Sequence, residues 1–178
     1  MLRCTAVAWG FIGVTLFLAM AVFGLLKHAV AVLDYPLSVM QWILLIGNIV
    51  FMAYTEGYRG FQKSFSPRVA ARVLYLSRHA NWLQTLFAPA FCLGYFGTTR
   101  RRQISVILLT LALTLLVIMV RELEQPWRGI IDAGVVVGLS WGLVSFILFT
   151  IQAFNGQDFA YSAEVNDTEY MADLANKN

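Results

Sequence analysis

Four long apolar runs constrain this chain more than any other feature, because each could cross a bilayer as an α-helix. Hydrophobic residues make up 59% of the 178 residues and charged residues 13%, against about 25% charged in typical soluble domains. A soluble fold of this size could not bury so much apolar surface. We therefore predict an all-α fold, a polytopic integral membrane helical bundle. The predicted spans cover residues 5–26, 37–54, 104–120 and 129–150.

A further apolar segment, residues 81–99, is harder to interpret. Gln84, Pro89, Gly94 and Gly97 interrupt it. Irregular backbone at membrane depth is tolerated where protein covers it, so we favour a broken or re-entrant segment that does not cross. The alternative is a fifth transmembrane helix.

Positive charge favours the four-span topology. Two basic regions, residues 59–78 and 100–102, flank the ambiguous segment. With four spans, both regions and the N-terminus face the cytoplasm, whereas five spans would place one basic region outside. We expect a bacterial cytoplasmic (inner) membrane with the N-terminus inside. Residues 1–155 would form one transmembrane domain, followed by an acidic polar tail, residues 156–178.

The first basic region should contain an amphipathic helix over residues 66–78. Ser66 is a suitable cap for it, and Pro67 a suitable first residue. Its apolar and basic faces are typical of a helix lying at a membrane surface. Basic residues beside membrane spans bind anionic headgroups rather than nucleic acid. The residues expected to contact headgroups are Arg59, Lys63, Arg68, Arg72, Arg78, Arg100, Arg101 and Arg102.

Gly134, Gly138 and Gly142 recur every four residues in the last predicted span. Small residues at this spacing share one helical face and let another helix approach closely. We expect the face to pack within the chain. The alternative is contact with a second copy or with other members of a larger membrane complex.

Two carboxylates fall within or beside the spans. Asp132 lies about one turn inside the last span, and we expect it to pair with Arg121 across the short preceding loop. Glu56 follows the second span and should pair with Arg59 or another loop arginine. The alternatives are a proton or solute site at Asp132 and a headgroup-level pocket at Glu56, where arginines could hold phosphate.

Three uncharged polar residues, Asn48, Thr110 and Thr114, also lie in predicted spans. In an apolar environment such groups usually hydrogen-bond to a neighbouring helix or to a carbonyl of their own helix. We expect that role here. Lining a solute path is the alternative.

We expect no metal or cofactor. His28 and His79, the two histidines, should lie at opposite membrane faces and cannot ligate one haem, and Cys4 and Cys92 lack metal-site spacing. No recognisable catalytic motif supports an enzyme. The leading hypothesis is a small membrane interaction or accessory protein, namely an assembly factor, a subunit or a lipid-associated protein. The alternatives are a small transporter or channel-like protein, and a lipid-modifying enzyme using Glu56 and His79 at the cytoplasmic interface.

Overall fold

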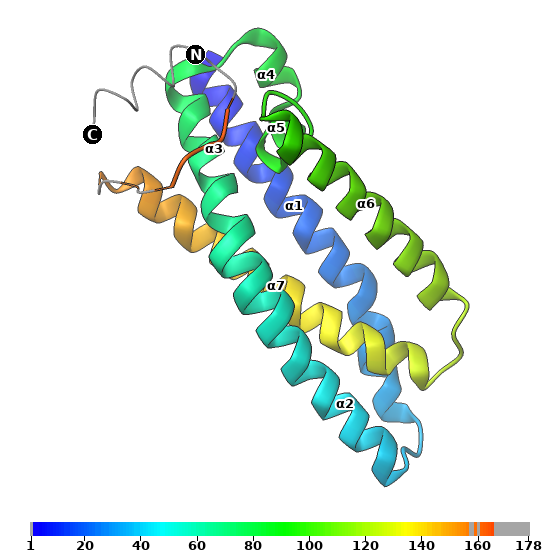
Figure 1. Ribbon diagram of the computed structural model, residues 1–178. Coiled ribbons are helices and arrows are strands. Elements are labelled where there is room, and N and C mark those ends of the chain that lie inside the picture. Colours follow the sequence, from blue (N-terminus) through cyan, green and yellow to red (C-terminus); the bar gives the residue numbers. More distant parts are fainter. Residues whose placement is uncertain (1, 157–158, 160, 166–178) are drawn as a thin grey trace. The chain divides into compact units, whose positions relative to one another are not determined.

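The computed structural model describes residues 2–156, 159 and 161–165, most of them helical. Outside the helices, an isolated antiparallel β-bridge pairs Thr98 with Val165. The remainder of the predicted acidic tail lies outside the described residues. In chain order, the elements of Figure 1 are α1 (Leu2–Ala31), the 3-10 turn η1 (Val32–Asp34), α2 (Val39–Met52), the π-helix η2 (Ala53–Phe65), α3 (Ser66–His79), α4 (Trp82–Leu86), α5 (Ala88–Leu93), α6 (Arg100–Arg121) and α7 (Trp127–Phe154).

Within the described part of the chain, four helical stretches are long and apolar enough to cross a membrane. They are Leu2–Asp34, Val39–His79, Arg100–Arg121 and Trp127–Phe154. The predicted number of such helices is confirmed, and each is longer than the apolar run that predicted it. Helix α1, for example, continues past Lys27, whose long side chain can extend along the helix to keep its charge in a polar environment.

The ambiguous segment 81–99 is broken, as we favoured. It forms the short helices α4 and α5, and Gly94 ends α5 in the left-handed region at φ 93°. Neither helix approaches the roughly 20 residues that a bilayer requires, so this segment supplies no fifth membrane-length helix. The start of α4 is set by Asn81, whose backbone N–H donates to the side chain of Gln84 over 3.1 Å.

Two predicted helix starts are wrong. The second span was expected to begin at residue 37, but Ser38 caps α2, because its hydroxyl accepts from the N–H of Gln41 and the Gln41 side chain accepts from the N–H of Ser38. Ser66 caps no new helix, because helical residues continue without interruption from α2 through η2 into α3. The Ser66 N–H donates to the carbonyl of Phe61, five residues back.

The π-helix η2 explains how Pro67 is accommodated inside a continuous helix. Proline lacks an N–H and its ring crowds the carbonyl four residues earlier. The wider turns of η2 shift the hydrogen-bond register to five residues just before that position. A local polar sequence therefore continues the helix, although it was expected to end it.

The described chain divides into two units. Unit 1 contains the described residues within 1–14, 68–111 and 150–165, and unit 2 contains residues 15–67 and 112–149. A small core in unit 2 joins Val32, Leu45 and Ile130. In unit 1, α3 and α5 supply most of the buried side chains, which include Val69, Ala70, Val73, Leu76, Ala88, Phe91 and Cys92.

Helix α3 has the predicted range but not the predicted setting. Its apolar residues are buried, and so is Arg72, which is only 1% exposed. A helix lying at a membrane surface would keep its basic face open. The prediction that Arg72 contacts headgroups from such a surface helix is therefore wrong, because this guanidinium lies in the interior of unit 1.

Protein covers the irregular segment around α4 and α5. Trp9 of α1 donates its indole N–H to the carbonyl of Leu86 over 3.2 Å. The absence of side chains at Gly10 and Gly13 lets α5 approach α1, since a Cβ at Gly13 would collide with the ring of Pro89. The backbone break occurs where neighbouring helices can shield it.

Candidate functional site

The glycine face of α7 is filled from within unit 2. A Cβ at Gly134 would collide with the side chain of Asn48, and one at Gly138 would lie 3.0 Å from a carboxylate oxygen of Glu56. At Gly142 it would lie 2.5 Å from the ring of Phe61. The prediction that these glycines form a packing face within the chain is confirmed.

The packing between η2 and α7 is reciprocal. Gly57 of η2 receives the ring of Trp141 of α7, whose Cγ would lie 3.0 Å from a Cβ at that glycine. The Trp141 indole N–H donates to the side-chain oxygen of Gln62 over 2.8 Å. Each helix therefore supplies a glycine that accommodates an aromatic ring of the other.

Asn48 forms the predicted hydrogen bonds between helices. Its side-chain amide donates to the carbonyls of Ile130 and Ile131 of α7, over 2.8 and 3.3 Å. These bonds satisfy the amide in an apolar setting and fix the register of α2 on α7.

Asp132 belongs to a network at the start of α7. Its carboxylate lies 3.7 Å from the guanidinium of Arg128, one turn earlier, so the predicted pairing with Arg121 is wrong. Arg128 also contacts the imidazole of His28 over 3.0 Å, and Gln125 donates to the His28 carbonyl over 3.2 Å. The i,i+4 partner is already available on the same helix, whereas the Arg121 side chain is exposed.

Glu56 is half-buried in η2 and forms no ion pair with the exposed Arg59, contrary to the prediction. Its carboxylate lies against the backbone of α7 at Gly138. It follows Met52, another residue that contacts this glycine face, by four residues, a spacing that keeps both on one side of the helix. Glu56 therefore contributes to the contact between η2 and α7.

In unit 1, the hydroxyl of Thr110 donates to the carbonyl of Val106 over 2.9 Å and lies 2.7 Å from the hydroxyl of Tyr95. The prediction of hydrogen bonding to its own helix is confirmed for this threonine. Thr114 is on an exposed part of α6.

Arg72 organises the interior of unit 1. Its Nε donates to the carbonyl of Ala163 over 2.9 Å, and Nη1 donates to the carbonyl of Cys92 over 3.2 Å. One guanidinium thus joins α3 to the end of α5 and to the chain that follows α7. The role of Arg72 in joining three segments was not predicted from the sequence.

Residues 161–165, which we call the strap, carry a carboxylate to this region. Ala163 and Val165 are buried, and the N–H of Thr99 donates to the carbonyl of Glu164 over 3.4 Å. The Glu164 carboxylate lies 4.0 Å from Arg68 and 3.9 Å from Arg102. Glu164 was predicted only as one of several acidic tail residues. In the sequence, the apolar residues Ala163 and Val165 on either side of Glu164 are the local indication that this stretch packs against other residues.

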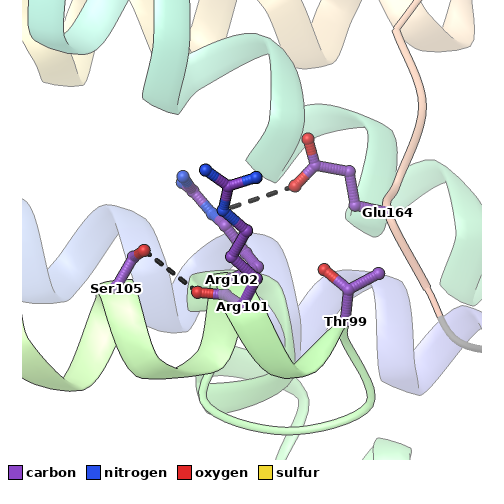
Figure 2. Close-up of a pocket in the computed structure, with 5 residues that line it drawn as sticks. All are labelled: Thr99, Arg101, Arg102, Ser105 and Glu164. Atoms are coloured by element: carbon purple, nitrogen blue, oxygen red, sulfur yellow. Dashed lines mark hydrogen bonds and ion pairs between the residues drawn. The ribbon is translucent and has the colours of Figure 1, made fainter.

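Arg68, Arg72, Arg102 and Glu164 form the arginine cluster. Beside it is a surface pocket of about 250 Å³ (Figure 2). The side chains of Arg102 and Glu164 extend toward each other above the start of α6, and the Ser105 hydroxyl points to the carbonyl of Arg101 (Figure 2). The pocket is lined by Thr99, Arg101, Arg102, Ser105 and Glu164.

The remaining basic candidates are exposed. Lys63 lies over the ring of Tyr58, 4.7 Å from its centroid. No ion pair involves the others among the residues with described positions. These exposed side chains are Arg59, Lys63, Arg78, Arg100 and Arg101.

No cluster of three or more His, Cys, Asp or Glu side chains suited to a metal occurs among the described residues. His28 belongs to unit 2 and His79 to unit 1. The Cys92 thiol is fully buried, and burial raises its pKa to about 12. A thiol in this state is a packing group rather than a nucleophile.

Comparison with known proteins adds no relative: no protein-family model, curated protein or solved structure matches the chain.

Proposed function

We propose that this chain is a small integral membrane interaction or accessory protein without a catalytic site of its own. It would act as an assembly factor, a subunit or a lipid-associated protein. The observation that carries the proposal is the outward orientation of apolar side chains on helices long enough to cross a bilayer. Helix α6 is the extreme case, because it has no buried residue although its residues 104–120 are mostly apolar. Lipid or an apolar partner would shield such a helix from water.

The contacts of the polar residues support packing over transport. A solute path through unit 2 would need polar groups directed to water. Asn48 is instead bonded to carbonyls of α7, and Asp132 is paired with Arg128. Glu56 lies against a glycine of the neighbouring helix. These groups stabilise helix contacts, which is the usual role of polar side chains between membrane helices.

The proposed orientation places the N-terminus and both basic regions on the cytoplasmic side of a bacterial inner membrane. The exposed basic residues would then meet anionic headgroups. Each lysine or arginine near an anionic surface contributes about 1 kcal/mol to the attraction. Contacts with a second copy or a larger membrane complex would use the apolar helix surfaces, because the glycine face is already filled.

A topology map tests the orientation. Reporters fused after Thr99 and at the C-terminus should both indicate the cytoplasm, because two spans precede the first site and four precede the second. A periplasmic signal after Thr99 would contradict the proposed arrangement of spans.

Lipid analysis and cross-linking test the proposed role. Protein extracted from native membranes in mild detergent should retain anionic phospholipid above its bulk proportion. Replacing Arg59 and Arg100 by glutamine should reduce that enrichment. The matched control replaces Lys27 and Arg121, exposed basic residues expected on the outer side. An equal loss of lipid enrichment in both variants would contradict the proposed lipid contact. A chain that cross-links to nothing in native membranes and retains no anionic lipid would contradict the accessory role.

A further inference from the structure

The arginine cluster of unit 1 carries more positive charge than its described partners neutralise. Arg72 is repelled by Arg102 and Arg68 and is attracted by the carboxylate of Glu164. Three guanidinium groups, all charged at neutral pH, thus share one carboxylate. Burial of Arg72 makes this imbalance more costly than it would be at a surface.

The hydrogen-bonding capacity of the cluster is also incompletely used. Nε of Arg68, Nη2 of Arg72 and Nε of Arg102 are buried and have no hydrogen-bond partner among the residues that the structure describes. Buried donors without a partner cost free energy and indicate that an acceptor is missing. Arg72 is the strongest case, because its side chain is 1% exposed while two of its other nitrogens are bonded.

Glu164 is a poor match for these donors. Its ion pairs with Arg68 and Arg102 are 4.0 and 3.9 Å long, beyond the 2.7–2.9 Å that is typical of charged hydrogen bonds. It also has a positive φ of 51°, which is uncommon for a residue other than glycine. The carboxylate lies among the arginines without forming the forked contacts that guanidinium and carboxylate prefer.

The strap is attached mainly through its backbone and small side chains. The Arg72 guanidinium donates to the carbonyl of Ala163, and the Thr99 N–H donates to the carbonyl of Glu164. The side chain of Val165 is buried. None of these contacts uses the Glu164 carboxylate. That side chain could therefore rotate away from Arg102 while the strap stays in place.

We propose that the arginine cluster is a binding site for a phosphate group, and that Glu164 partly occupies it when no phosphate is bound. Phosphate oxygens would accept hydrogen bonds from Arg68, Arg72 and Arg102, with the pocket beside Arg102 receiving the group to which the phosphate is attached. A phosphate carries more charge than a carboxylate and has oxygens in three directions, so it suits three converging arginines. This proposal does not depend on the proposed accessory role or on membrane orientation.

Equilibrium dialysis of the purified full chain in an uncharged detergent tests the site, with radiolabelled inorganic phosphate as the probe at constant ionic strength. Wild-type protein should bind phosphate saturably. Arg102→Gln should weaken binding about tenfold, the effect of losing one charged hydrogen bond. Glu164→Gln should strengthen it several-fold, because the competing carboxylate is removed. Arg100→Gln is the matched control, with the same change in charge at an exposed position, and should alter affinity by no more than about twofold.

Two results with the variants would overturn the proposal. Equal weakening by Arg100→Gln and Arg102→Gln would mean that phosphate responds only to overall charge. Unchanged or weaker binding in Glu164→Gln, in protein whose thermal unfolding matches wild type, would mean that Glu164 is a structural partner and not a competitor. Should Arg102→Gln fail to fold, Arg68→Gln provides the same test from the half-buried edge of the cluster.

A competition arm identifies the source of the phosphate group. The protein is placed in phosphatidylcholine nanodiscs with or without phosphatidic acid, whose headgroup is a phosphomonoester. Loss of inorganic phosphate binding in the presence of phosphatidic acid would assign the site to a lipid headgroup, whereas unchanged binding would assign it to a free phosphate compound. Absence of saturable phosphate binding in wild type and in Glu164→Gln, together with no effect of phosphatidic acid on stability, would overturn the proposal.

Discussion

The two units handle buried charge in opposite ways. In unit 2, Asp132 has Arg128 one turn away on the same helix, and Arg128 also contacts His28. In unit 1, the Glu164 carboxylate lies near the limit for an ion pair from both Arg68 and Arg102, and it also attracts the charge of Arg72. The first network is close to balanced in charge among the described residues, although Nε of Arg128 and Oδ2 of Asp132, 3.7 Å apart, form no hydrogen bond there. The second network has unneutralised positive charge and guanidinium donors without acceptors. An anionic ligand that supplies both the charge and the acceptors would bind most favourably at such a place.

The units also differ in how their helices approach one another. Unit 2 relies on glycines that bring α7 close to α2 and η2. In unit 1, the buried Arg72 links three segments through backbone carbonyls. Glycines also bring α5 close to α1 in unit 1, so the difference between the units lies in Arg72. Substituting Arg72 should act by loss of hydrogen bonds, whereas substituting the α7 glycines should act by collision.

The largest expected effect concerns Cys92 and tests whether unit 1 is closed around its buried groups. With Cys4 replaced by serine, alkylation of Cys92 by N-ethylmaleimide at pH 8 should be on the order of 10³-fold slower in folded protein than in SDS. Burial raises the pKa of the thiol to about 12, so only about one thiol in 10⁴ would be ionised at pH 8. Mass spectrometry over time measures the rate. Similar rates in both conditions would show that the interior of unit 1 is open.

The next largest effect should follow Gly142→Leu in unit 2. Because even a Cβ would press on the ring of Phe61, we expect a loss of about 3 kcal/mol or more in stability. Gly47→Leu is the control, because no atom lies within 4 Å of a Cβ built at that exposed glycine of α2. Thermal unfolding in detergent, monitored by size-exclusion chromatography, measures the stability of the two variants. Equal destabilisation would contradict the packing role of the glycine face.

An intermediate effect is expected for Arg72→Met, which keeps an unbranched side chain but removes the donors. The carbonyls of Ala163 and Cys92 lose their partner, and we expect a loss of about 2 kcal/mol, partly offset by removal of a buried charge. The strap should become accessible to limited proteolysis before the helices unfold. Arg78→Met, at an exposed position of the same helix, should leave the cleavage rate unchanged. Identical proteolysis of the two variants would contradict the role of Arg72 in holding the strap.

The smallest effect should be that of Asn48→Ala, at about 1 kcal/mol, the usual range for a hydrogen bond between membrane helices. Thr55→Val is a suitable control, since the Thr55 hydroxyl donates to the carbonyl of Phe51 within its own helical segment. Chemical denaturation in mixed micelles measures the difference. A cost in Asn48→Ala no larger than that of the control would mean that this amide adds nothing to the contact with α7.

Several elements followed directly from the sequence. Long apolar runs predicted the four membrane-length helices, because the length of a run and its lack of charge are local properties. Pro89 and the glycines near it predicted the break in segment 81–99 for the same reason. The glycine spacing in α7 predicted a packing face, although it could not identify α2 and η2 as the occupants.

The arginine cluster could not be predicted, because its members come from distant parts of the chain. Arg68 and Arg72 were assigned to an exposed helix face on the basis of periodicity alone. Periodicity does not reveal that a second segment, the strap, covers that face. Asp132 shows the same limit on a smaller scale: two arginines were close enough in sequence to pair with it, and the geometry within one helix selected Arg128.

The π-helix η2 has a consequence for the spacing of side chains along the chain. Met52 and Glu56 are four residues apart, but the next residues facing α7, Phe61 and Ser66, follow at intervals of five. In an ordinary α-helix, a step of five residues turns the side chain about 140° away from the starting face. Because a turn of η2 contains more residues than an α-helical turn, side chains five residues apart stay on the face that contacts α7. Deleting a single residue between Glu56 and Phe61 would leave a step of four, which an ordinary α-helix keeps on nearly the same face, so that turn would no longer need π-helical spacing.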